Sequence, residues 1–265
     1  MRFWHFTQSR VRSLLGRFLP FIARPLAILG CLGCVLLGLS AGAVDRLPPP
    51  QAHPLPSGLA AWVDRDRQGD YFDQIPKTQA EYLIWSQFPV KVYVEPVSKS
   101  TPLVRSQAWV KAVEQAIVEW NAFLPLQVVD LPEGADIRVL RSGLPLRVVT
   151  QPNGKLSLPR LRSAETRYEL YARSIPNASA ILAHRCTVVV QPNQAIEYIL
   201  ASARHELGHA LGIWGHSLLQ TDALYFSQVR HPPLISARDV NTLKRVYEQP
   251  TRLGWPLGSD RSSRH

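Results

Sequence analysis

Two histidines four residues apart, with a glutamate between them, place the strongest constraint on how this chain can fold. They are His205 and His209, in the segment HELGHALGIWGH, and Glu206 follows the first of them. On a helix this spacing puts both imidazoles on one face, about one turn apart, so both can reach one metal ion. Glu206 would project beside the ion, which is the position of a general base acting on a zinc-bound water.

The residues that follow extend this pattern to a third ligand. Gly212 is predicted to end the helix, because glycine tolerates the left-handed conformation that a helix C-terminus needs. The chain can then fold back and offer His216. Catalytic zinc is held by three protein ligands and one open position, whereas structural zinc usually has four ligands. The pattern therefore predicts a catalytic Zn2+ site held by His205, His209 and His216.

These residues resemble the metzincin family of zinc proteases, most closely its matrixin branch, whose pattern is H-E-x-x-H-x-x-G-x-x-H. The chain matches this pattern in order through Gly212. The third histidine of the family would fall at Gly215, and it follows one residue later as His216. The extra glycine is expected to let the turn absorb one added residue. The resemblance covers about Pro89 to Tyr247 and implies a zinc-dependent protease.

The resemblance also implies a turn beneath the zinc, which carries a methionine in metzincins. This chain has no methionine beyond Met1, and Leu224 of the segment 222–225 stands in the methionine position. Leucine is close to methionine in volume and apolarity, so the exchange is well tolerated. Tyr225 could orient a zinc ligand, stabilise an oxyanion or simply pack. His231 is an alternative third ligand.

Hydrophobic periodicity predicts an α+β domain over residues 59–250. The expected elements are strands at 89–94, 126–129, 136–140, 167–171 and 186–190, and helices from Ser106 to Phe123, from about Asn193 to Gly212 and from Ser236 onward. As in metzincins, this gives a mixed twisted sheet with a helix packed on it, an active-site helix and a C-terminal helix. The strand at 167–171 is expected at the edge, where a metzincin pairs with its extended substrate.

The N-terminal residues 1–43 are typical of a secretory signal. Arginines precede a nearly continuous apolar run, and Ala41-Gly42-Ala43 forms a small-residue cleavage site. An uncleaved membrane anchor is the alternative, because the run from Leu26 to Val44 is just long enough to span a bilayer. Either way we expect the body to be secreted, periplasmic or otherwise extracytoplasmic, and membrane association is possible through this segment.

Composition excludes several other classes of protein. The chain has 46% hydrophobic and 19% charged residues, which are globular values. Five of its 30 basic residues lie before position 44, where there is no acidic residue, leaving 25 basic against 20 acidic residues. This mild excess gives no reason to propose a nucleic acid partner. Only Cys186 remains once the signal is removed, so the mature chain has no internal disulfide, and we expect this thiol in the core.

Three further segments carry weaker signals. The prolines of 44–58 predict a semi-rigid linker, and 251–265 is predicted to be a flexible polar tail. Residues 64–70 alternate acids like a calcium loop, but Ile75 stands where a bidentate glutamate is needed, which favours a solvated loop.

Together the patterns predict an exported zinc endopeptidase acting on peptides or proteins, with Glu206 as the general base and Zn2+ as the cofactor. One alternative is an inactive relic of such a site, serving as a binding or cell-envelope interaction module. Another is a basic module for an anionic polymer, although the positive charge is diffuse. A bare H-E-x-x-H can also occur by chance on a helix surface. The sequence does not indicate an oligomeric state.

Overall fold

The computed structural model describes residues 2–3, 47–97, 103–142, 149–150, 156–157 and 163–258. Apart from residues 2–3, the predicted signal or anchor at 1–43 lies outside this part of the chain. Within the described residues, no helix combines the length and apolarity needed to cross a membrane.

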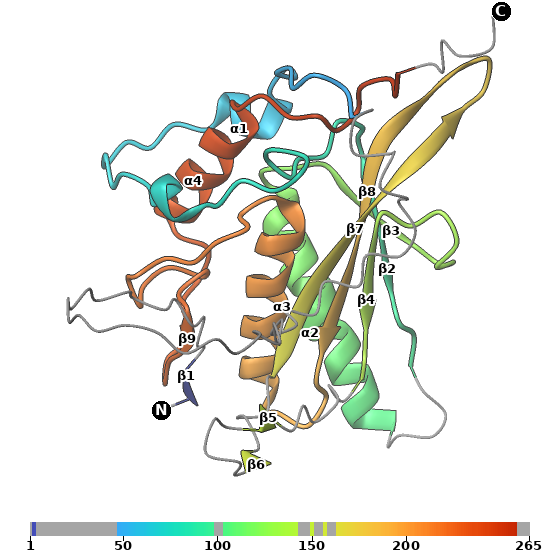
Figure 1. Ribbon diagram of the computed structural model, residues 1–265. Helices are drawn as coiled ribbons and strands as arrows, with labels where there is room; N and C mark the ends of the chain where they lie inside the picture. Colours follow the sequence, from blue (N-terminus) through green and yellow to red (C-terminus); the bar gives the residue numbers. More distant parts are fainter. Residues whose placement is uncertain are drawn as a thin grey trace, which may run out of the picture.

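A five-stranded mixed sheet forms one layer of the protein, with the strand order β3-β2-β4-β8-β7 (Figure 1). Its strands are β2 (Val90–Val94), β3 (Leu126–Val129), β4 (Ile137–Leu140), β7 (Ala164–Ile175) and β8 (Ala178–Val190). Strands β3, β2, β4 and β8 run parallel, and β7 pairs antiparallel with β8 at the edge. Two short antiparallel pairs lie apart from this sheet, β1 (Arg2–Phe3) with β9 (Ser227–Gln228) and β5 (Val149–Thr150) with β6 (Leu156–Ser157).

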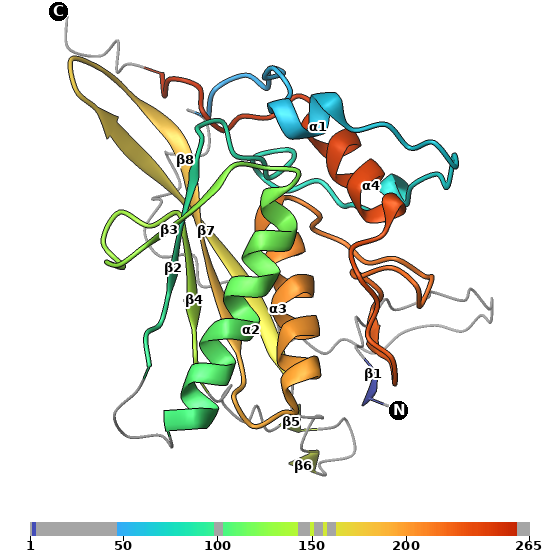
Figure 2. The same cartoon turned by 180° about the vertical axis from the view of Figure 1, so that it is seen from behind.

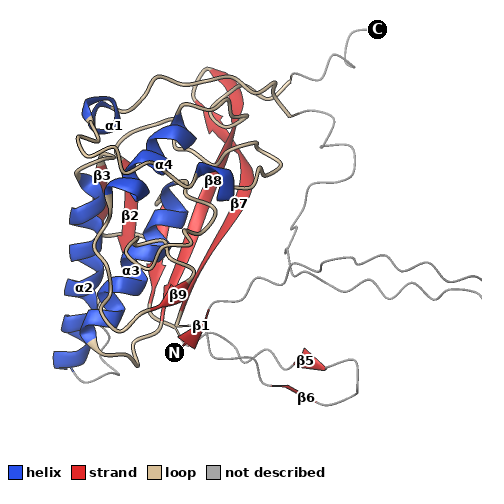
Figure 3. Ribbon diagram, turned by 90° about the vertical axis from the view of Figure 1, so that its left-hand side faces the viewer, coloured by secondary structure: helices blue, strands red, loops and turns tan. Residues whose placement is uncertain are grey.

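Two long helices form the second layer. They are α2 (Leu103–Asn121) and α3 (Ile196–Leu211), which lie side by side over one face of the sheet (Figure 2). Seen from the side, helices and sheet form two layers (Figure 3). The short α1 (Ser57–Ala61) and the 3-10 turn η2 (Phe72–Gln74) each contact α4 (Ala237–Tyr247). The mixed sheet, the two helices packed on it and the C-terminal helix confirm the predicted α+β class.

The aromatic face of α2 forms the centre of the core, as its 3.6-residue period predicts. Trp109 and Trp120 are fully buried, and each indole finds a backbone acceptor on a neighbouring element. The indole of Trp109 donates to the carbonyl of Val190 on β8 at 3.2 Å, and that of Trp120 donates to the carbonyl of Arg204 on α3 at 2.9 Å. The two tryptophans therefore tie α2 to both the sheet and α3 while burying large apolar surfaces.

Several predicted boundaries differ from those observed. Ser106 was expected to cap α2 but lies inside it, where its hydroxyl accepts a hydrogen bond from Arg141. Helix α3 begins after Ala195 rather than near Asn193. Strands β7 and β8 are longer than predicted because they form one hairpin, and Asn177 adopts the positive φ of 57° that its tight turn requires.

Residues 251–258 were predicted to belong to a flexible tail, and this expectation is wrong for them. Thr251 is fully buried and exchanges backbone hydrogen bonds with Gln51 at 2.9 and 3.0 Å. Leu253 packs with Ala80, Leu83 and Leu182 in a second apolar cluster. The described part of the predicted linker 44–58 is therefore held on the domain through these contacts, which join segments 200 residues apart in the sequence.

Two acidic side chains of the loop 64–70, those of Asp64 and Asp70, are paired with protein groups. Asp64 accepts hydrogen bonds from the main chain of Gln68 and from the amide of Asn241, at 2.7 and 2.6 Å. Asp70 forms an ion pair with Arg245 of α4 at 3.1 Å. These contacts attach the loop to α4.

Substituting Leu253 tests whether the C-terminal segment belongs to the folded domain. Leu253 is only 1% exposed, so Leu253→Ala is expected to lower the free energy of unfolding by about 2–5 kcal/mol. Leu131 is 68% exposed, and Leu131→Ala should change it by less than about 0.5 kcal/mol. Denaturant unfolding of both variants provides the measurement, and equal effects would contradict the packing described here.

Candidate metal centre

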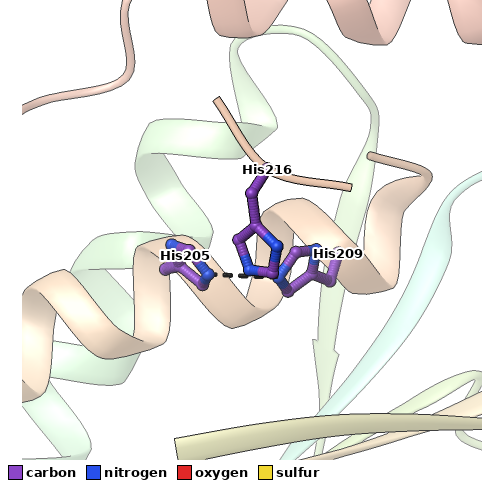
Figure 4. Close-up of side chains that lie close together, drawn as sticks. All are labelled: His205, His209 and His216. Carbon is purple, nitrogen blue, oxygen red and sulfur yellow. Dashed lines mark hydrogen bonds between the residues drawn. The ribbon is translucent and has the colours of Figure 1, made fainter. Parts of the chain in front are cut away.

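Three imidazoles converge at one point beside α3 (Figure 4). His205 and His209 extend from α3, and His216 extends from the loop that follows it. The Nε2 atom of His209 lies 3.1 Å from that of His205 and 3.2 Å from that of His216. Histidine, cysteine, aspartate and glutamate side chains can all bind metals. Within the described residues, these three histidines are the group of such side chains that lies close enough together to hold a metal ion.

The spacing of these nitrogens fits a tetrahedral ion. Zinc–nitrogen bonds of about 2.0–2.1 Å at tetrahedral angles place two ligand nitrogens about 3.3 Å apart. The observed distances of 3.1 and 3.2 Å are close to this value. His231, the alternative third ligand, is exposed and lies outside the cluster. The structure therefore brings together the three predicted histidines, and the chemistry of the donor set fits Zn2+.

A sharp reversal after α3 brings His216 back over the helix. The amides of Gly212 and Ile213 donate to the carbonyls of His209 and Gly208, at 3.1 and 3.0 Å. This is the bonding pattern of a Schellman motif, and Gly212 supplies the positive φ of 135°. Helix α3 therefore ends at the predicted glycine, and its last carbonyls are satisfied.

The residue added to the motif is absorbed in a tight turn. The amide of Trp214 donates to the carbonyl of Gly212 at 2.9 Å, which shortens the path to His216. A Cβ atom at Gly215 would lie 2.2 Å from the carbonyl oxygen of Gln74, so only glycine fits there. The expectation that the extra glycine absorbs the added residue agrees with this geometry.

Main-chain carbonyls orient two of the imidazoles. His205 Nδ1 lies 2.8 Å from the carbonyl oxygen of Ala223, and His209 Nδ1 lies 2.6 Å from that of Ile213. Each Nδ1 must carry the proton to donate, so each Nε2 presents a lone pair toward the centre. Lone pairs facing one another across about 3 Å repel unless a cation lies between them, which is a further sign of fit to a metal ion.

Burial keeps these histidines neutral. It is the main cause that lowers the pKa of His209 to about 4 and the pKa of His216 to about 3. The pKa of His205 is also well below its usual value, through burial first and then through the neighbouring imidazoles. A neutral imidazole is the form that binds a metal, so the site needs little deprotonation at neutral pH.

The turn at 222–225 packs beneath the metal helix, where the metzincin resemblance places it. Leu224 is fully buried, and a Cβ atom at Gly208 would lie 2.6 Å from one of its methyl groups. The leucine side chain therefore fills the space left by the glycine of the motif. Tyr225 is partly buried and packs against Phe226 with ring centroids 4.5 Å apart. This contact matches the packing alternative for Tyr225, and a role toward a ligand stays a prediction.

Glu206 is buried beside the histidines and held by a residue that the sequence analysis missed. Glu206 is only 2% exposed, and its Oε2 atom accepts a hydrogen bond of 2.7 Å from the hydroxyl of Thr166. Thr166 lies on β7, outside the stretch predicted as an edge strand. Alternation along a longer strand would have placed it on the same face as Tyr168, but its contact with Glu206 depends on how β7 packs on α3.

Comparison with known proteins does not assign the chain to a family. No protein-family model matches it, and no curated protein matches its sequence. Among solved structures, a similar one is the archaemetzincin amzA from Methanopyrus kandleri, with a TM-score of 0.36 and 16% sequence identity. The match covers 59% of this chain and 94% of that one. The function proposed below rests on the residues of the site and not on this likeness.

The neutral histidines predict that acid destabilises the metal-free protein. Unfolded histidines titrate near pH 6.5, whereas the pKa values of His209 and His216 in the fold are about 4 and about 3. Between these values the unfolded chain binds more protons, so the free energy of unfolding falls as the pH falls from about 6.5 toward 4.

The measurement is denaturant unfolding at several pH values in the presence of a chelator, for the wild type and for His216→Phe. The variant should lose part of the pH dependence because one of these groups is gone. His184, whose burial also lowers its pKa to about 3, contributes equally to both proteins. Identical pH dependence in the two proteins would contradict the assignment.

Proposed function

We propose that this chain is an exported zinc-dependent endopeptidase of the metzincin type. The observation that carries the proposal is the conjunction of three converging neutral imidazoles with a buried glutamate next to the first of them in sequence. A structural zinc does not need such a glutamate, whereas hydrolysis at an open zinc position does. Export is inferred from the N-terminal sequence alone.

The residues of the site would divide the work between holding the ion and moving a proton. His205, His209 and His216 would hold Zn2+, which when bound supplies a Lewis acid that polarises a carbonyl and lowers the pKa of water. Glu206 would accept a proton from the attacking water and pass it to the leaving amine. The carbonyls of Ala223 and Ile213 would keep the imidazoles in the tautomer that faces the ion.

We propose that an extended peptide would bind along the edge of β7, which is the last strand of the sheet within the described residues. In the five-stranded sheet this strand pairs only with β8, so its other side offers main-chain donors and acceptors. The ring of Tyr168 on β7 lies edge-on to the ring of Trp214, with centroids 5.0 Å apart. The centroid of Trp214 in turn lies 5.9 Å from that of His209. A peptide paired along β7 would therefore run close to the histidines, as peptide-bond hydrolysis at this site requires.

The alternative of an inactive binding module finds less support in the geometry. The two departures from the metzincin pattern are the added residue before His216 and the leucine at position 224. The first is absorbed by the turn at Trp214, and the second packs tightly under the motif glycine. Both departures are thus compatible with a site that turns over.

Removal of the glutamate separates catalysis from metal binding. Glu206→Ala is expected to keep bound zinc but to lower peptide cleavage by at least about 100-fold, because general acid–base catalysis typically contributes 10²–10⁴-fold. The assay compares the purified 44–265 proteins on a mixed peptide library, with and without a chelator. Normal cleavage by the variant would refute the mechanism, and no cleavage by either protein would favour the binding module.

Single histidine substitutions test the ligand set. His205→Ala and His216→Ala should each lower the affinity for zinc by more than about 100-fold, because the loss of a partner outside the ligand set already costs 10–100-fold. His231→Ala is the matched control, since this exposed histidine lies outside the cluster. Zinc titration against a competing chelator gives the affinities. Weak binding by the His231 variant, with normal binding by the His216 variant, would reassign the third ligand.

A further inference from the structure

The hydroxyl of Thr166 contacts Glu206 at two points. Its Oγ1 atom lies 2.7 Å from the carboxylate oxygen Oε2 and 2.9 Å from the main-chain carbonyl oxygen of the same glutamate. A hydroxyl carries one proton, and an ionised carboxylate is the stronger acceptor of the two. The bond to Oε2 is therefore the main one, and the carbonyl oxygen shares the same proton as the weaker acceptor.

This double contact restricts the conformation of the glutamate side chain. Oε2 and the main-chain oxygen of Glu206 both lie within 3 Å of Thr166 Oγ1, so the hydroxyl joins the carboxylate to the stretch of α3 from which it extends. An unrestrained glutamate has three rotatable bonds and would sample several orientations. The contact thus selects one orientation for a carboxylate whose position decides whether it can accept a proton.

Thr166 is partly buried on the face of β7 that packs on α3, and its hydroxyl is used in the contact with Glu206. On β7 it pairs with Val188 of β8, and its neighbours on the same face are Ala164 and Tyr168. This face packs on α3, whereas Glu165 and Arg167 on the other face form an ion pair with each other at 2.8 Å. A valine would suit the strand and the apolar packing equally well, so the hydroxyl is the distinctive feature of this position.

We propose that Thr166 is a positioning residue, whose hydroxyl holds the Glu206 carboxylate in the orientation that proton transfer requires. The proposal rests on the peptidase function proposed above and adds a residue to it. Because Thr166 lies on the strand whose edge would bind the peptide, the same element would align the substrate and the base. Its side chain faces α3 and not the strand edge, so peptide binding itself should not depend on the hydroxyl.

The test is a comparison of three variants of the zinc-loaded protein on a peptide that the wild type cleaves. Thr166→Val removes the hydroxyl and keeps the shape, so kcat should fall roughly 10- to 100-fold, as misplacement of a reacting group by about 1 Å does. KM and zinc content should be unchanged. Thr166→Ser keeps the hydroxyl and should retain most of kcat. Thr187→Val, on β8 and the opposite face, is the matched control and should behave as the wild type.

A second measurement does not depend on activity or on metal. Denaturant unfolding of the chelator-treated wild type, Thr166→Val, Glu206→Ala and the double variant forms a double-mutant cycle. If the hydroxyl and the carboxylate are bonded, the effect of Thr166→Val on the unfolding midpoint should be smaller once Glu206 is removed. Strictly additive effects would show that the two side chains do not interact.

The two measurements separate the possible failures. An active wild type whose kcat survives Thr166→Val would overturn the positioning role and leave the peptidase function standing. A fall in kcat that Thr166→Ser does not restore, or that comes with loss of zinc, would assign Thr166 to packing of α3 and would also overturn the proposal. A wild type that cleaves no peptide would refute the peptidase function, and the positioning role with it, whatever the cycle shows.

Discussion

The buried carboxylate of Asp239 is the interaction on which the arrangement of this site depends. It belongs to the first turn of α4, where it forms a capping box with Ser236. It also accepts hydrogen bonds from the hydroxyl of Tyr71, at 2.5 Å, and from the main-chain amide of Ala223, at 2.8 Å. The carbonyl of Ala223 in turn orients His205. One residue of main chain therefore links the cap of the C-terminal helix to His205, so α4 supports the candidate metal site although none of its residues belongs to the histidine cluster.

The turn beneath the metal helix is held by polar contacts as well as by packing. Asp222 is fully buried and accepts hydrogen bonds from Ser217, Ser236 and Arg238, at 2.5 to 3.1 Å. These bonds connect the residue after the third histidine to the start of α4. Leu224 is then fixed under Gly208 with little freedom. A buried hydrogen-bonded network specifies one conformation more strictly than apolar contact alone, so the turn that carries Leu224 is well defined.

What could be predicted from the sequence was what local spacing determines. The four-residue interval between His205 and His209 puts both side chains on one face of any helix. Gly212 predicts the end of the helix and the chain reversal that brings His216 back toward them. The pairing of Gln51 with Thr251 could not be predicted, because proline-rich and polar segments carry no periodicity and the contact joins opposite ends of the domain. Thr166 was missed for a similar reason. The contact of Thr166 with Glu206 depends on which face of β7 packs on α3. The sequence of a strand does not show which helix will pack on it.

Helix α3 breaks a general rule at the point where the chemistry would occur. Three consecutive polar residues, Arg204, His205 and Glu206, are each no more than 6% exposed. Burial of such groups is costly unless each is paired. Here each has a partner on a different element: Arg204 pairs with Glu119 of α2, His205 with the turn at Ala223, and Glu206 with β7. The helix is thereby fixed from three sides, because the same bonds that make burial tolerable also restrict its rotation and sliding. The candidate site on α3 therefore gains its rigidity from this pairing of buried polar groups.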